Sequence, residues 1–254
     1  MAERRLNLVF RAGAIFITFI LSSVIGQADE PWRDGEQLRY EIHWGMFVAA
    51  EVNFTAKSQS HDDLPSWSFQ LDLKSRGVVD SLYPMQSSFL SAQQSAPWRS
   101  VLFTAHRNEN KREKKYRTEI NYVSQEGSFE NKTDQTSEQF AFEEAALDDL
   151  LSSLYTLRRH PWEEEKTCKL TLYEDRSLKQ AEARLIELTN EKDENGRRHP
   201  CFLIEAREQG ELEEGKRRVV SRIWITRDAR RIPLRAECQV RFGTFRMTLK
   251  QKSI

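Results

Sequence analysis

The sequence has little cysteine and no excess of charge of either sign: of its 254 residues three are cysteines, and 39 Lys and Arg balance 39 Asp and Glu. A balanced chain lacks the positive charge that phosphate neutralisation usually requires, so nucleic-acid binding is not expected. The cysteines Cys168, Cys201 and Cys238 show no Cys-x-x-Cys or Cys/His spacing, so neither a metal site nor a cofactor is expected. At most one intramolecular disulfide can form among them, and the sequence leaves the pairing open.

Recognisable catalytic motifs are also missing. There is no Gly-x-Ser-x-Gly elbow, no His-Glu-x-x-His helix and no glycine-rich phosphate loop. The carboxylate groups Asp148 with Asp149, and Glu163 to Glu165, are expected at solvated helix ends or loops, where nothing shields them for acid–base work. The histidines are scattered over different expected elements: His43, His61, His106, His160 and His199. The chain is therefore not expected to be an enzyme; no catalytic or metal-binding residue is assigned, and the ligand-binding residues are unknown.

The sequence has one long apolar run, Ala12–Ile25, which follows three arginines and ends in small residues. This order is typical of a secretory signal, and the run is shorter than the roughly 20 residues of a spanning helix. We expect residues 1–28 to be a signal peptide, cleaved after Gly26 or Ala28, with an uncleaved membrane anchor as the alternative. The mature chain would then lie in the periplasm with no membrane span, in a compartment where a disulfide can persist.

Apolar and polar residues alternate through most of the remaining chain, which is the pattern of half-buried β-strands. The alternating segments are Leu38–Trp44, Val48–Ala56, Trp67–Leu73, Phe89–Gln94, Val101–His106, Tyr116–Tyr122, Cys168–Tyr173, Ala181–Leu188, Cys201–Ala206, Val219–Thr226, Leu234–Phe242 and Thr244–Lys250. An antiparallel sheet of about a dozen strands tends to curl or split. The prediction is a mainly β fold, a strongly curved antiparallel sheet or incomplete barrel, forming a single domain over residues 29–254.

One segment departs from the alternation. Glu143–Arg159 places leucines three and four residues apart, with Asp148 and Asp149 early, basic residues late and Pro161 just beyond. Acidic residues at the start and basic residues at the end suit the helix dipole, and proline stops a helix. The pattern predicts one helix over Glu143–Arg159, packed against the sheet, where it covers one end or one concave surface.

Glycine, proline and charge predict the connections between strands. Gly77 and the pair Tyr83-Pro84 predict a bend without regular structure, a corner between two parts of the sheet. The charged segment Arg107–Lys115 is interpreted as a solvated hairpin tip, and Gln209–Lys216 as a turn. Asp228 is expected to bind the backbone of a tight turn, as aspartate commonly does.

Several stretches resemble a bacterial exported family known as DUF3108, a domain of unknown function. They are Gly35–Tyr40 with Trp44-Gly45, Ser75–Pro84, and Asp228–Arg235 after Trp224, while Asp149–Arg158 fits the same plan. The resemblance implies a curved antiparallel sheet similar to periplasmic lipoprotein carriers of the LolA and LolB type, with one or more helices against its concave side. It supplies no catalytic residue and no functional position.

Aromatic residues are frequent in the first half of the mature chain: Trp44, Phe47, Phe54, Trp67, Phe69, Tyr83, Phe89 and Trp98. They could form the core, or they could line a space between sheet and helix that encloses a hydrophobic ligand. The leading hypothesis is a periplasmic binding or carrier-like protein for a lipid-like or other apolar envelope ligand. The alternative is a non-catalytic envelope scaffold or docking module that contacts an envelope protein through the basic segments Arg107–Arg117 and Arg227–Arg235. The sequence does not set the oligomeric state.

Overall fold

The computed structural model describes residues 30–61, 64–174, 176–209, 220–240 and 243–253. The chain divides into the units Met1–Glu30 and Pro31–Ile254, and the fold below is that of the second unit. The expected signal peptide and almost all of the expected turn Gln209–Lys216 lie outside the described residues. No helix within the described part has the length and hydropathy to cross a bilayer.

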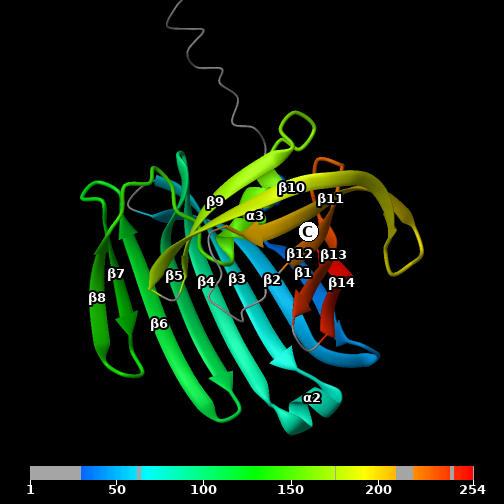
Figure 1. Cartoon of the computed structure of the whole chain (residues 1–254), viewed down its shortest axis with the longest axis horizontal. Helices are drawn as coiled ribbons and strands as arrows, with labels where there is room; N and C mark the ends of the chain where they lie inside the picture. Colours follow the sequence, from blue (N-terminus) through cyan, green and yellow to red (C-terminus); the bar gives the residue numbers. More distant parts are fainter. Residues whose placement is uncertain (1–29, 62–63, 175, 210–219, 241–242, 254) are drawn as a thin grey trace, which may run out of the picture. The chain divides into compact units, whose positions relative to one another are not determined.

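The described residues form one sheet of fourteen strands in which all neighbours are antiparallel. The strands are β1 (Glu36–Trp44), β2 (Phe47–His61), β3 (Leu64–Ser75), β4 (Met85–Ser95), β5 (Trp98–Glu109), β6 (Arg112–Asn121), β7 (Glu126–Asn131), β8 (Thr136–Ala141), β9 (Thr167–Glu174), β10 (Ser177–Lys192), β11 (Arg198–Glu208), β12 (Val220–Thr226), β13 (Pro233–Val240) and β14 (Gly243–Ser253). Figure 1 shows the strands running side by side from β3 to β8, with β9–β11 crossing above them.

Among the strands that the structure describes, only the β1–β14 pairing joins strands that are not neighbours in sequence. Strands β1 to β8 follow chain order on one side of the β1–β14 pair, and β9 to β14 follow it on the other. Consequently β8 and β9, which are consecutive in the chain, become the two outer edges of the sheet. These edges lie close together, because the rings of Phe140 on β8 and Tyr173 on β9 stack with centroids 4.0 Å apart.

Further contacts bridge the two edges. Arg176, in the β9–β10 turn, forms an ion pair of 2.7 Å with Glu138 on β8, and Asp148 makes a parallel β-bridge with Leu172 on β9. Register shifts in β1, β4, β10 and β12 mark bulges, which bend strands and increase twist. The predicted antiparallel sheet, strongly curved into an incomplete barrel, is confirmed, with fourteen strands rather than about a dozen.

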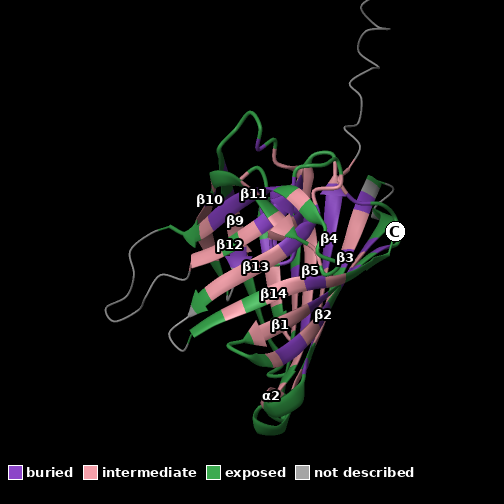
Figure 2. Cartoon of the chain, turned by 90° about the vertical axis from the view of Figure 1, so that its right-hand side faces the viewer, coloured by how far each residue is buried: buried purple, intermediate pink, exposed green. Residues whose placement is uncertain are grey.

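Two helices lie among the described residues, α2 (Gly77–Leu82) and α3 (Ser152–Arg159). α3 is the predicted helix packed against the sheet, and α2 is a second, short helix that the sequence pattern did not indicate. α2 occupies the predicted corner, where Gly77 has φ +56°, a backbone conformation that favours glycine. Figure 2 shows α2 as an exposed element at one end of the sheet. The segment that was expected to bend without regular structure therefore contains a short helix after a left-handed residue.

The predicted helix Glu143–Arg159 is too long, because regular helix begins only at Ser152. The residues before it follow the edge of the sheet: the Asp148 amide donates to the Thr171 carbonyl, and the Ser100 amide donates to the Leu147 carbonyl. Backbone groups bound to neighbouring strands are unavailable for helical hydrogen bonds. The leucine periodicity correctly indicates which residues face the core, but it does not show that the backbone before Ser152 forms hydrogen bonds with strands in place of helical ones.

α3 packs inside the curve of the sheet. Its residues Tyr155 and Leu157, with Leu151 just before it, join apolar clusters that also contain residues of β1, β2, β3, β11, β12 and β13. Phe69 on β3 stacks against Tyr155 with ring centroids 3.5 Å apart. β11 is buried on both faces, since Leu203 belongs to one cluster and its neighbours Phe202 and Ile204 to another. Two-sided burial explains why this strand is a continuous apolar run.

Candidate functional site

A cavity of about 540 Å³ lies on the concave face of β4–β8. The strand register builds it: Phe89 on β4 lies opposite Ala105 on β5, which lies opposite Tyr116 on β6. One step along the strands, Phe103 on β5 lies opposite Thr118, which lies opposite Phe129 on β7. Because alternate residues of a strand share a face, these two rows form one inward surface.

The aromatic side chains of this surface are only partly covered by the rest of the core. Phe89, Phe103, Tyr116 and Phe129 are partly exposed, although they point inward. Phe69 on β3, in the same interior, is in contrast fully buried. α3 fills the space over one part of the curved sheet and leaves the part over β5–β8 open. The cavity therefore presents an apolar wall to a space of a size common for ligand pockets.

The far side of the cavity comes from the other edge of the sheet and from the segment before α3. Tyr173 on β9 and Leu150 line it, and Leu150 is 58% exposed. The lining therefore combines residues about 80 positions apart in the sequence. Only curling of the sheet brings them together.

A positively charged rim borders the apolar wall. Arg107 and Lys114, a cross-strand pair on β5 and β6, line the cavity together with Arg176, and Asp134 is the single acidic residue of the lining. Arg107 binds Glu109 at 2.7 Å and Arg176 binds Glu138. The Lys114 ammonium group makes no hydrogen bond or ion pair with any residue that the structure describes. The cavity thus has an apolar interior and a cationic border.

The aromatic residues that the sequence singled out separate into three groups in the structure. Phe54 and Phe69 are buried in the core, and Trp67, Phe89 and Trp98 pack against it. Trp44, Phe47 and Tyr83 are exposed. Of these eight residues only Phe89 lines the cavity. The core interpretation holds for most of them, and the cavity takes its remaining aromatic residues from β5, β6, β7 and β9, which the sequence argument missed.

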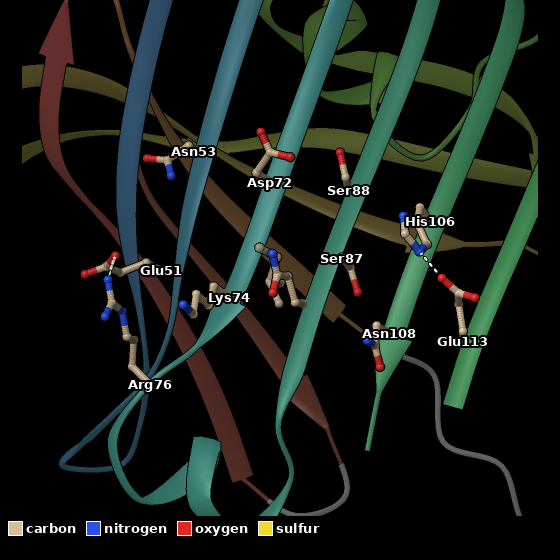
Figure 3. A pocket seen from close by; sticks show the side chains of 12 residues that line it. Glu51, Asn53, Asp72, Lys74, Arg76, Ser87, Ser88, His106, Asn108 and Glu113 are labelled. Carbon is tan, nitrogen blue, oxygen red and sulfur yellow. Dashed lines mark hydrogen bonds and ion pairs between the residues drawn. The ribbon is translucent and has the colours of Figure 1, made fainter. Parts of the chain in front are cut away.

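A second hollow, on the opposite face of the sheet, is polar (Figure 3). Four of its charged or titratable side chains are paired: Arg76 binds Glu51 at 2.5 Å, and His106 binds Glu113 at 2.7 Å. Ser88 lies opposite His106 on the adjacent strand, so a serine, a histidine and a carboxylate share this hollow. Within the described residues, however, no hydrogen bond joins the Ser88 hydroxyl to His106, and the histidine is exposed. We therefore regard the inner cavity as the stronger candidate site.

The other histidines lie away from the cavity. His199 binds Asp193 at 2.9 Å, His160 lies 3.1 Å from the Glu165 carbonyl oxygen, and His43 is near Glu41. The side chain of His61 lies outside the described residues. Among the described residues no histidine lines the inner cavity.

The prediction that Asp148 and Asp149 are solvated is wrong. The Asp149 carboxylate is buried, where the hydroxyls of Ser91 and Ser100 donate to it at 2.6 and 2.7 Å. It also accepts hydrogen bonds from the amides of Leu151 and Ser152, both at 2.8 Å, which caps the turn before α3. Burial raises the pKa of Asp149, and these hydrogen bonds oppose the rise. Asp149 thereby ties the start of α3 to β4 and β5, beside the cavity.

Glu163 to Glu165, in contrast, are exposed as predicted.

The neighbouring carboxyl group, Asp148, has a strongly perturbed titration. Burial raises its pKa to about 6, against the hydrogen bond from the Thr156 hydroxyl, and the charge of Asp149 raises it further. A carboxyl group with a folded-state pKa above its unfolded value stabilises the fold when protonated. That contribution is complete below about pH 4 and is lost as the pH rises through about 6.

We therefore expect Asp148→Asn to remove part of the pH dependence of stability. An amide cannot ionise, and its oxygen can accept the Thr156 hydrogen bond. The variant should match the wild type near pH 4 and exceed it at pH 7.5, by up to about 3 kcal/mol. Urea unfolding at the two pH values measures the difference. An Asp148→Asn variant that is equally destabilised at both pH values would contradict this assignment.

A buried ion cluster fixes α3 to the sheet. Arg158 and Glu36 are each 1% exposed and form an ion pair of 2.6 Å, and Arg230 binds the other Glu36 oxygen at 2.6 Å. Arg158 also donates to the carbonyls of Arg231 and Arg230, at 3.0 Å each. Glu36, Arg158 and Arg230 come from three of the stretches that resemble the family. Because these stretches meet in one buried ion cluster, the motifs have a structural role.

The basic segments expected to dock a partner are largely engaged within the chain. Arg231 binds Glu163 at 2.6 Å and Arg235 binds Glu237 at 2.5 Å, in addition to the Arg230 contact with Glu36. Asp228 accepts a hydrogen bond from the Arg230 amide, which confirms its predicted role in the turn. Arg107–Lys115 is the end of the β5–β6 hairpin, with the turn at Asn110 and Lys111, and none of its residues is buried, which agrees with the predicted solvated tip.

The three cysteines are free thiols, so no disulfide pair forms among them. Cys168 and Cys201 are buried, and burial raises their thiol pKa values to about 12 and about 11. Cys238 on β13 is partly exposed.

Together the fold and the cavity define an antiparallel, barrel-like β protein with an internal cavity of mixed apolar and cationic character. The chain belongs to the DUF3108 family, described as a protein of unknown function, whose profile matches residues 39–250. The resemblance seen in the sequence motifs is thereby confirmed. The search of curated proteins found no match.

Solved structures share the fold. The chain is similar to a beta-barrel-like protein of the DUF1849 family from Brucella abortus, with a TM-score of 0.58, 8% identity and coverage of 87% of this chain and 98% of that one. Lower TM-scores, 0.37 and 0.34, were found for an inferred exported protein with a YmcC-like fold from Bacteroides fragilis and an inferred lipoprotein from Parabacteroides distasonis. Each is 6% identical and covers 87% of this chain, with 97% and 96% of the other chain matched.

Proposed function

We propose that this protein is a non-catalytic, exported binding or carrier protein of the periplasm, for a lipid-like or other apolar envelope ligand held in the inner cavity. The observation that carries the proposal is the set of inward but partly exposed aromatic side chains over β4–β7. Apolar surface left in contact with water is costly, and a ligand that covers it gains the corresponding free energy. The N-terminal signal pattern supports the export part, and the curved sheet with an internal helix supports the likeness to LolA and LolB-type carriers.

A cavity-filling substitution tests the proposal. Ala105 lies at the centre of the inward row, so Ala105→Trp should occupy the cavity and weaken binding of an apolar fluorescent probe, N-phenyl-1-naphthylamine, by about ten-fold or more. Thr104→Trp is the matched control, because Thr104 precedes Ala105 on the same strand and faces the polar side. Probe titration by fluorescence gives both affinities, and melting temperatures verify that both variants fold.

A second substitution guards against a folding failure of the first. Leu150→Arg places a charge against the cavity from an exposed position, where little packing is lost, and it should also weaken probe binding. Native mass spectrometry of the chain purified from its own cells should show a co-purifying apolar ligand. Equal probe affinity in the wild type and both cavity variants would refute the cavity as the binding site.

The alternative is an envelope docking module, and one observation favours it. Large apolar side chains are exposed at one end of the sheet, in the β1–β2 turn and in and beside α2: Trp44, Met46, Phe47, Val78, Leu82 and Tyr83. α2 is held against β2 by the Arg76 amide, which donates to the Ala49 carbonyl at 2.8 Å. Exposed apolar clusters of this kind mark interaction surfaces. Docking would use this apolar end more readily than the basic segments, whose charges are largely paired.

A further inference from the structure

The two ends of the cavity of the proposed function differ in chemistry: along the strands, its lining changes from aromatic to cationic side chains. From the Phe103 row to the Arg107 row is four residues on β5, or roughly 13 Å at the rise of a β-strand. Aromatic groups occupy the first row, and Arg107 and Lys114 face each other in the second. An uncharged ligand would leave this cationic row without a function, whereas a ligand with one apolar and one charged end matches both.

The three cations of the border are paired unequally: Arg107 and Arg176 form ion pairs with Glu109 and Glu138, whereas Lys114 has no ion-pair partner among the described residues. Three cations line the cavity against one carboxylate, Asp134. The carboxylate of Asp134 accepts a hydrogen bond of 2.7 Å from the side-chain amide of Asn131. The guanidinium groups of Arg107 and Arg176 keep further N–H donors beyond their contacts with Glu109 and Glu138, because a guanidinium has five. Lys114 has all three of its donors free of any partner within the described part of the chain.

We propose that the ligand is an anionic amphiphile, a long acyl chain that ends in a carboxylate or phosphate group, whose headgroup is bound by Arg107, Lys114 and Arg176. This inference rests on the proposed function and adds the class of ligand and its orientation. The acyl chain contacts Phe89, Phe103 and Phe129, and the headgroup lies toward the β5–β6 turn. Charge-assisted hydrogen bonds from three cations select for the anion.

The headgroup also connects binding to the seam between β8 and β9. Arg176 contacts Glu138 across that seam and lines the cavity, so a bound anion would share the Arg176 guanidinium with Glu138 through its remaining N–H donors. Tyr173, which stacks on Phe140 at the seam, lines the cavity as well.

The test compares palmitate with its uncharged counterpart, monopalmitin, by displacement of N-phenyl-1-naphthylamine from the full chain. The triple variant Arg107→Gln, Lys114→Gln, Arg176→Gln should bind palmitate on the order of ten-fold or more weakly, and monopalmitin with an unchanged affinity. The control Lys115→Gln, Arg117→Gln, Lys132→Gln removes three charges from residues that line a hollow on the opposite face and should bind both as the wild type does. The single variant Lys114→Glu, at a side chain without internal contacts, gives a second measurement that does not depend on folding of the triple variant.

The outcomes separate the two proposals. If the wild type binds palmitate and monopalmitin equally and the triple variant changes neither, the headgroup proposal fails while the cavity remains a ligand site. If the wild type binds neither, and the apolar probe also fails to bind, the proposed function fails. Inorganic phosphate that binds as tightly as palmitate, with the same loss in the triple variant, would show a site for free anions and overturn the amphiphile.

Discussion

Arg158→Ala is expected to lower the free energy of unfolding by about 3–5 kcal/mol, because it leaves the Glu36 carboxylate buried with only part of its countercharge. The substitution also removes the hydrogen bonds to the carbonyls of Arg231 and Arg230. Since these contacts tie the end of α3 to the β12–β13 turn and to the start of β1, the helix should lose its fixed position. Urea-induced unfolding, followed by tryptophan fluorescence, gives the change.

Arg184→Ala is the control for this prediction. Arg184 on β10 pairs with Glu182, but its side chain is 66% exposed, and exposed ion pairs contribute little. The change should cost at most about 1 kcal/mol. Equal destabilisation by the two substitutions would show that the buried cluster has no special importance for the fold.

Asp149→Leu is expected to cost about 3 kcal/mol or more, because it leaves two buried hydroxyls and two backbone amides without their acceptor. Leucine has a similar bulk but no oxygen. The start of α3 would then lose its tie to β4 and β5, and Leu150 its fixed place at the cavity. The free energy of unfolding and the affinity for the apolar probe should therefore both fall.

Asp149→Asn distinguishes the need for hydrogen bonds from the need for charge. The amide oxygen can still cap the turn, and the amide N–H groups can donate to the hydroxyl oxygens of Ser91 and Ser100, which accept as well as donate. Its cost should be about 1 kcal/mol or less. If asparagine proves as damaging as leucine, the negative charge of Asp149 is required and the hydrogen-bond account is insufficient.

Local alternation identified the strands because a strand that buries one face alternates apolar and polar residues, and this pattern is visible in a short stretch of sequence. The resemblance motifs located Glu36, Arg158 and Arg230 without explaining them, since an ion cluster is visible only when three distant segments meet. The helix was placed correctly at its packed end but extended too far at its start. There the backbone groups of Leu147 and Asp148 form hydrogen bonds with β5 and β9, and the spacing of apolar residues does not indicate such long-range hydrogen bonds.

The cavity shows the same limit. Arg107 and Lys114 lie in a segment that the sequence indicated as a solvated hairpin tip, and the sequence argument did not single out Arg176 or the aromatic residues that β5, β6, β7 and β9 contribute to the cavity. Only the register aligns Arg107 with Lys114, and only the approach of β8 to β9 adds Arg176 and Tyr173.

The sequence by itself thus determined the mainly β fold, its antiparallel curvature and the presence of one inner helix, because two-residue and leucine periodicities follow from burial of one face of each element. The tertiary structure decided which part of the interior α3 fills and which part stays open. That division depends on contacts between segments far apart in the chain, where the carboxylate of Asp149 and the guanidinium of Arg158 hold the helix in place, and such contacts leave no local pattern.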